Sequence, residues 1–257
     1  MIGLEAITHD YGRGRVLDGI DLAFVRGCVT SICGPNAAGK TTMLRIAAGL
    51  LVPSTGRVLL DGTPIGGIPA GRRARRLAFM SQRFECVSGF SVRRVLELAR
   101  VLVGRDPVAL DRVIAELELE PILTRSIGAL SVGQCQRVAL ARALAQLPSD
   151  GVLILDEPLA ALDPRWQQRA SECLRKRAGE GATVLLSVHE LPVAARLAQR
   201  VVLLADGSLV AEGPSEAVLR PEPLQAAYEM PFELLTANDG TLIPVPSSDR
   251  SADTLST

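Results

Sequence analysis

Apolar residues follow two different periods along the chain, and the period changes several times. Alternating apolar positions predict strands over residues 4–11 and 15–27, separated by a Gly/Arg turn. A short buried strand is predicted over 28–33, and a helix over 40–50 follows a glycine-containing loop. Further strands, with helices between the later ones, are predicted at 57–60, 76–82, 151–157, 182–190 and 200–210. Because strands and helices alternate, the expected fold class is α/β with a mostly parallel sheet.

A helical period replaces the strand pattern in the middle of the chain. From Ser91 to Leu102 the apolar residues fall at helical spacing, Asp106 and Pro107 suit the start of a second helix, and a third is predicted over 131–147. The last dozen residues are polar and are expected to be disordered. The expected organisation is a core with a helical insertion and a C-terminal extension, at residues 1–83 with 148–220, 84–147 and 221–257 respectively.

Composition excludes several classes of partner. The 257 residues are 47% apolar, enough for a large core, and 28 basic residues balance 28 acidic ones, so no basic field is available to attract nucleic acid or anionic lipid. Five cysteines lie scattered without a C-x-x-C pair, which is typical of a reducing compartment. No signal peptide pattern and no apolar run of membrane-spanning length are present. We therefore expect a cytoplasmic chain that reaches a membrane only through a partner.

The stretch CGPNAAGKTT indicates a phosphate-binding loop. Residues 34–41 fit the pattern G-x-x-x-x-G-K-[ST], between a predicted strand and a predicted helix. Such loops point backbone N–H groups at phosphate oxygens, with Lys40 reaching the β- and γ-phosphates and the Thr41 hydroxyl binding Mg²⁺. The alternative is a fortuitous glycine turn. However, only two of the 28 basic residues are lysines, so a lysine at this position favours the functional interpretation.

Polar residues also end three other predicted strands. Asp156 and Glu157 follow VLIL, where a carboxylate can bind Mg²⁺ and its neighbour can polarise a water, although a solvated strand end fits equally well. His189 and Gln82 end strands in the same manner, and a structural role is the alternative for each. Ser131 begins a capping box, which is an ordinary helix start and also a possible anion site.

Taken together, these motifs resemble the ATP-binding cassette (ABC) ATPases. The resemblance covers about residues 2–220. The matching motifs are the Walker A loop at 34–42, the Gln loop at Gln82, the signature at 130–134, Walker B at Asp156 and Glu157, the D-loop at 161–164 and the switch histidine at His189. It implies a P-loop NTPase core with flanking helices, an N-terminal antiparallel β subdomain and an inserted α-helical subdomain. Two residues depart from the family pattern, since Ala37 and Val132 stand where glycine is usual.

The resemblance also implies cofactors and residue roles. The cofactors are ATP and Mg²⁺, with Glu157 as general base and with His189 and Gln82 sensing the γ-phosphate and the water. The metal ligands implied are Thr41, Gln82 and Asp156. The residues implied to bind ATP, with Tyr11 stacking on adenine and the signature serving a partner cassette, are Tyr11, Gly34, Asn36, Ala37, Ala38, Gly39, Lys40, Thr41, Thr42, Ser131, Gly133, Gln134 and Asp163.

Partners follow from the same resemblance. Such cassettes form head-to-tail dimers, here a homodimer or a pair with another cassette, and bind integral-membrane permease subunits. SVRRVLELAR and LQAAYEMPFELL are similar to importer cassettes for iron-siderophore, haem or cobalamin, which often also use a substrate-binding protein. We expect a peripheral protein on the inner face of the cell membrane. Other metal or amino-acid importers, two-component exporters and non-transport cassettes remain alternatives.

Overall fold

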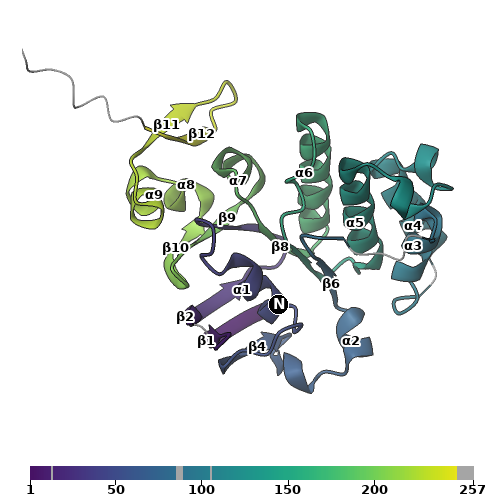
Figure 1. Ribbon diagram of the computed structural model, residues 1–257, viewed down its shortest axis with the longest axis horizontal. Coiled ribbons are helices and arrows are strands. Elements are labelled where there is room, and N and C mark those ends of the chain that lie inside the picture. Colours follow the sequence, from purple (N-terminus) through teal and green to yellow (C-terminus); the bar gives the residue numbers. More distant parts are fainter. Residues whose placement is uncertain (13, 85–88, 105, 248–257) are drawn as a thin grey trace, which may run out of the picture.

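Figure 1 shows the computed structural model, which describes residues 1–12, 14–84, 89–104 and 106–247. Its strands are β1 Ile2–Asp10, β2 Arg15–Phe24, β3 Val29–Cys33, β4 Thr55–Leu60, β5 Thr63–Pro64, β6 Leu77–Met80, β7 Val152–Leu155, β8 Thr183–Ser187, β9 Arg200–Ala205, β10 Ser208–Pro214, β11 Phe232–Thr236 and β12 Leu242–Pro246. Its α-helices are α1 Lys40–Ala47, α2 Ala70–Ala74, α3 Val92–Ala99, α4 Pro107–Glu116, α5 Val132–Gln146, α6 Pro164–Gly179, α7 Leu191–Leu197, α8 Ser215–Val218 and α9 Pro221–Tyr228. Three short 3₁₀ helices lie at Ile65–Gly67, Glu120–Ile122 and Ile127–Ala129.

A six-stranded sheet in the order β10-β9-β3-β8-β7-β6 forms the centre of the protein. All neighbouring strands run parallel except β10, which is antiparallel to β9. Every residue of β3, β7 and β8 is buried, as expected for parallel strands covered on both faces. The predicted α/β fold with a mostly parallel sheet is therefore confirmed.

The two faces of this sheet pack into two separate cores. Ile32, Ile154 and Leu185 face α1 and the antiparallel sheet β2-β1-β4-β5. Their neighbours on the same strands, such as Leu153 and Val184, face α5, α6 and α7 on the opposite side. Figure 1 shows this arrangement, with α1 between the two sheets and α5 to α7 beyond the parallel one. The expected antiparallel β subdomain is present.

One predicted strand was wrong. The apolar run 200–210 forms two antiparallel strands, β9 and β10, joined by a tight turn at Asp206 and Gly207. Both turn residues have positive φ, 46° and 76°, the geometry of the two-residue turns whose twist suits a hairpin. The Asp-Gly pair inside the apolar run is a sequence signal for this turn, and it determines the local structure although the residues around it are continuously apolar.

The helical insertion contains α3, α4 and α5. Buried residues of all three helices, among them Val95, Ile114 and Leu140, join the core that covers the parallel sheet. Helix α3 ends at Ala99, so Leu102, predicted to continue its apolar stripe, is instead half exposed.

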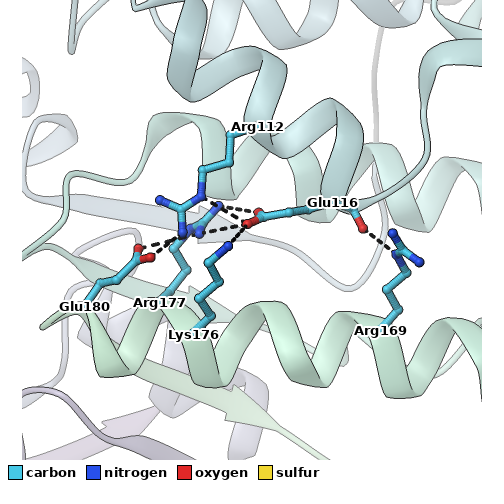
Figure 2. A network of polar contacts seen from close by, with 6 residues as sticks. All are labelled: Arg112, Glu116, Arg169, Lys176, Arg177 and Glu180. Atoms are coloured by element: carbon cyan, nitrogen blue, oxygen red, sulfur yellow. Dashed lines mark hydrogen bonds and ion pairs between the residues drawn. The ribbon is translucent and has the colours of Figure 1, made fainter.

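An ion network connects this insertion to α6 of the core (Figure 2). The Glu116 carboxylate at the end of α4 bonds to Lys176 Nζ at 2.8 Å and to Arg177 Nη2 at 2.6 Å, both on α6. Arg112 on α4 bonds to Glu116 and to Glu180, and Arg169 Nε donates to the Glu116 carbonyl at 2.7 Å. Burial opposes ionisation of Glu116, but the hydrogen bonds from these cations outweigh it and lower its pKa to about 2.

A buried arginine on α5 reinforces the same junction. The Arg137 guanidinium lies 3.8 Å from the ring centroid of Trp166 on α6 and donates to the Leu117 carbonyl at 3.1 Å. The stacking uses the guanidinium face, while the hydrogen bond uses its edge. Helices α4, α5 and α6 are thus held together by cations.

The C-terminal extension is ordered well beyond residue 221. Helix α9 packs on β9 and β10, and the hairpin β11-β12 packs on α7. The expected disorder at the end of the chain falls mainly on residues 248–257, which lie outside the described part. Within the described ranges no helix is both long and apolar enough to cross a membrane.

We expect Glu116→Gln to lower the free energy of unfolding by about 2 kcal/mol at pH 7, because it leaves three cations without their shared carboxylate. This value is discounted for solvent screening at the edge of the network. Since the pKa of Glu116 is lower in the folded state, its contribution is complete above the unfolded pKa and is lost as pH falls from about 5 towards 2. Urea unfolding at pH 7 and at pH 3.5 should therefore show the difference narrowing. The matched control is Glu172→Gln on α6, whose carboxylate bonds only to Gln168 among the described residues. An equal loss in both variants contradicts the network.

The loop between β3 and α1 contains backbone strain. Ala37 has φ 65°, in the left-handed region, where a side chain costs about 1–2 kcal/mol. Glycine removes this strain. It also increases the conformational entropy of the unfolded chain, which lowers the free energy of unfolding by about 0.4–1 kcal/mol. Ala37→Gly should therefore raise the free energy of unfolding by about 0.5–1 kcal/mol in urea titrations. Ala38→Gly is the control: Ala38 is buried and free of this strain, so its replacement should destabilise the protein. A loss of stability in both variants contradicts the strain.

Candidate functional site

The loop from Gly34 to Gly39 joins β3 directly to α1. Gly39 is the N-cap of α1 with φ 96°, and a Cβ there would lie 2.7 Å from the Val16 carbonyl oxygen, so only glycine fits. Asn36 and Ala37 are exposed at the tip, whereas Ala38 is buried beneath them. The first N–H groups of α1 thus open onto a concave loop, which is an arrangement that binds phosphate.

Lys40 lies at the centre of this loop. The residue is 6% exposed, and its Nζ donates to the carbonyl oxygens of Gly34 and Pro35, both at 2.7 Å. Burial lowers the pKa of Lys40, and nearby Cys33, Glu157 and Asp156 oppose that shift. The chain therefore encloses the ammonium, which lies close enough to Glu157 and Asp156 to interact with their charge.

Asp156 connects the ends of β7 and β8 to the start of α1. Its Oδ1 accepts hydrogen bonds from Thr41 Oγ1 at 3.1 Å and from Ser187 Oγ at 2.8 Å. Its Oδ2 is buried without any hydrogen-bond partner among the described residues. An unpartnered carboxylate oxygen next to a threonine hydroxyl fits a hard divalent cation that takes oxygen ligands. The residues present therefore suit Mg²⁺, with Thr41 and Asp156 as the protein ligands.

Glu157 and His189 form the second part of the site. Glu157 Oε1 lies 2.5 Å from His189 Nε2, and the glutamate has a left-handed backbone with φ 51°. A small cavity of about 30 Å³ borders both side chains, which is room for a water molecule. A carboxylate that holds an imidazole beside such a cavity can accept a proton from that water.

Two residues of this site were not predicted from the sequence. Ser187 Oγ bridges the acids, since it donates to Asp156 and accepts from the Glu157 N–H at 2.8 Å. Gln136 Nε2, on α5, donates to the Glu157 carbonyl at 2.9 Å. Ser187 lies two residues before His189 at the end of a buried strand, which is a signal that could have identified it. Nothing in the local sequence of Gln136 indicates its role.

Tyr11 lies beside the start of α1. Its hydroxyl is 3.4 Å from Thr42 Oγ1, its ring meets His9 edge-on at 4.6 Å, and the residue is 53% exposed. The structure thus brings the predicted stacking residue next to the loop, with much of its surface available to a planar ligand.

The predicted signature residues lie apart from the loop, at the start of α5. Ser131 and Gln134 form a complete capping box, in which each side chain accepts the other's backbone N–H. A Cβ on Gly133 would lie 3.2 Å from the Ala161 carbonyl oxygen, so the signature packs on the segment that precedes α6. Val132 takes the first helical position, which needs only helical dihedrals that valine can adopt, and it is 75% exposed.

Asp163 and Gln82 are placed differently from the central cluster. The Asp163 side chain accepts from the Trp166 N–H at 3.0 Å and caps α6, which accounts for it structurally. Gln82 is exposed, and no hydrogen bond joins it to Asp156 or Glu157 in the part of the chain that the structure describes. It lines a cavity of about 520 Å³ between α1 and α5. The roles of these two residues remain predictions.

Comparison with known proteins agrees with this geometry. The profile described as "ABC transporter" matches residues 17–160. The hemin import ATP-binding protein HmuV of Pseudomonas putida is 38% identical over 89% of this chain and 92% of its own length. HmuV of Rhodopseudomonas palustris is 35% identical over 96% of each chain. The cobalamin import ATP-binding protein BtuD of Halobacterium salinarum is 34% identical over 93% of this chain and 61% of its own length.

Solved structures show the same architecture. An ATP-binding subunit of an ABC transporter superposes with a TM-score of 0.78 over 88% of this chain at 26% identity. A dimeric ATP-binding cassette in a post-hydrolysis state, bound to ADP and Pi, has a TM-score of 0.77 over 84% of this chain at 29% identity. The chain therefore belongs to the ABC transporter family, and it is an ATPase of the kind that binds ATP with Mg²⁺.

Proposed function

We propose that this chain is the ATP-hydrolysing subunit of an importer that works through a separate membrane permease, on the inner face of the cell membrane. The proposed cargo is a haem, cobalamin or iron-siderophore type of compound. The observation that carries the importer class is the similarity to relatives named for hemin and cobalamin import, which covers 96% of this chain in the Rhodopseudomonas palustris protein. A substrate-binding protein is the expected further partner.

ATP binding is assigned to the loop and the residues around it. Lys40, the loop N–H groups and the α1 N-terminus suit the phosphates, and the exposed ring of Tyr11 suits the adenine. Thr41 and Asp156 would hold Mg²⁺, which neutralises phosphate charge when bound. Gln82 is proposed as a further ligand that approaches only when nucleotide is present.

Hydrolysis is assigned to Glu157 as general base. Its carboxylate is close to His189 and borders the water-sized cavity, so it can orient a water and accept its proton. Ser187 fixes the backbone N–H of Glu157 and thereby the direction of the side chain. His189 is proposed to contact the γ-phosphate from the same position.

The second copy of the chain is expected to complete each site. Ser131, Gly133 and Gln134 lie on the helical insertion and pack on their own D-loop rather than on their own Lys40 loop. A helix N-terminus presented in this way can bind the γ-phosphate of a facing protomer. We therefore infer a head-to-tail homodimer, in which Asp163 lies near the interface. A dimeric relative among the solved structures supports this arrangement.

The permease is proposed to dock between the core and the insertion. The cavity of about 520 Å³ is lined by Gln82 and Phe84 together with Arg45 of α1 and Arg142 of α5. It thus joins the Gln loop to both parts of the protein. In this proposal the core comprises residues 1–83 and 148–220, the helical subdomain 84–147 and the extension 221–257.

We expect Glu157→Gln to reduce the ATP hydrolysis rate by about 10²–10⁴-fold, because an amide cannot accept the proton. ATP binding should persist, since the loop, Lys40 and Asp156 are unchanged. Size-exclusion chromatography with Mg-ATP should then show a stable dimer, while phosphate release measures the rate.

The control is Glu172→Gln on α6, whose carboxylate bonds to Gln168 and does not line the water-sized cavity. It should hydrolyse ATP at close to the parental rate. Parental hydrolysis by the Glu157→Gln variant would show that another group is the general base.

The cargo assignment predicts a single transport defect. Native cells that carry only the Glu157→Gln variant should lose uptake of one of three labelled compounds, namely haem, cobalamin or a ferric siderophore, while the Glu172→Gln cells retain it. Loss is expected because permease cycling depends on ATP hydrolysis. Unchanged uptake of all three compounds contradicts this class of importer.

A further inference from the structure

A tyrosine near the C-terminus reaches the start of the phosphate loop. The backbone N–H of Gly34 donates to the hydroxyl of Tyr228 at 3.1 Å, across 194 positions of sequence. The carbonyl of the same glycine accepts from Lys40 Nζ at 2.7 Å. Both polar groups of Gly34 are therefore held by side chains, one from α9 and one from α1.

Gly34 lies just beyond the last residue pair of β3 and β9, so its N–H bonds to the Tyr228 hydroxyl and not to a neighbouring strand. Strand β3 pairs with β9 up to Cys33 and Leu203, and the chain then turns away with φ 145° at Gly34. A Cβ on Gly34 would lie 2.1 Å from the Leu204 carbonyl oxygen, so the backbone passes tightly against β9. A buried N–H at this point needs a partner, and Tyr228 supplies it.

Tyr228 is itself held firmly in place. It is the last residue of α9, whose Leu224 and Ala227 are buried in the main core. Its ring meets Phe232 edge-on at 5.6 Å, and Phe232 begins the hairpin β11-β12. The helix fixes the ring from one side and the hairpin from the other.

The surroundings keep this hydroxyl neutral. Burial raises the pKa of Tyr228, the neighbouring Cys33 adds to the shift, and the bond from Gly34 opposes it. A neutral phenol accepts one N–H and retains a second lone pair and its own proton. No proton is therefore transferred at this contact, and its effect is one of position.

We propose that Tyr228 is a positioning residue for ATP binding, which sets where the phosphate loop leaves β3 and so makes the C-terminal extension part of the nucleotide site. The hydroxyl does not touch the nucleotide. It fixes Gly34, and through the Gly34 carbonyl it fixes the resting position of the Lys40 ammonium. This inference rests on the proposed ATP site.

The extension also meets the other half of that site. The hairpin strand β12 packs on α7, the helix that begins two residues after His189, and Ile243 is a buried residue of β12. The loop and the histidine thus share one supporting segment.

Tyr228→Phe removes the hydroxyl and keeps the ring. The KM for ATP should rise about tenfold while kcat stays within about twofold, because the loop is no longer held in its binding geometry but the base is intact. The control is Ile243→Ala, which loosens the same extension without touching the hydroxyl. It should lower the thermal midpoint, and it should raise the KM for ATP much less than Tyr228→Phe does.

A second readout uses the presence of only two tyrosines in the chain. Protein labelled with 3-fluorotyrosine should give two ¹⁹F resonances, and the Tyr228→Phe variant identifies which belongs to Tyr11. Mg-ATP should shift both resonances, that of Tyr11 by stacking and that of Tyr228 through Gly34.

The outcomes separate the two assignments. A Tyr228 resonance that stays unmoved while that of Tyr11 shifts, or a parental KM in Tyr228→Phe, overturns the positioning role alone. If neither resonance moves, the ATP site itself is wrong and the inference falls with it.

Discussion

The carboxylate of Asp156 holds the polar edge of the parallel sheet together. It accepts hydrogen bonds from Thr41 at the start of α1 and from Ser187 at the end of β8, and Ser187 in turn holds the N–H of Glu157. These contacts depend on register, because Leu155 of β7 pairs with Leu186 of β8. A shift of one residue would turn the polar ends towards the opposite core.

A second constraint is the attachment of the helical insertion. The cations of α6 hold the end of α4 at the Glu116 carboxylate, while Arg137 of α5 stacks on Trp166. Gln136, next to Arg137, reaches the Glu157 carbonyl. Helix α5 is therefore connected to Glu157, the proposed base, through Gln136, so a movement of the insertion would reach that acid.

Local patterns were enough to predict the parallel sheet, the phosphate loop and the acids at the end of β7, since each depends on residues adjacent in sequence. Other features depend on distant partners. The Tyr228 contact joins positions 194 residues apart, and no period in the sequence reports it. The φ of Ala37 follows from how the loop is held at both ends, not from alanine itself. The turn at Asp206 had a local sequence signal, the Asp-Gly pair, but the apolar residues around it led to the prediction of one continuous strand.

The buried ammonium of Lys40 has a further consequence. Its two short bonds to backbone carbonyls already satisfy much of its need for oxygen partners. A simple anion such as inorganic phosphate or sulfate offers it little more than these carbonyls do. At the proposed site, a nucleoside triphosphate would contact the ammonium, the loop amides and the Tyr11 ring at the same time. The contacts that Lys40 already makes would therefore weaken the binding of a single small anion relative to a ligand that makes several contacts together.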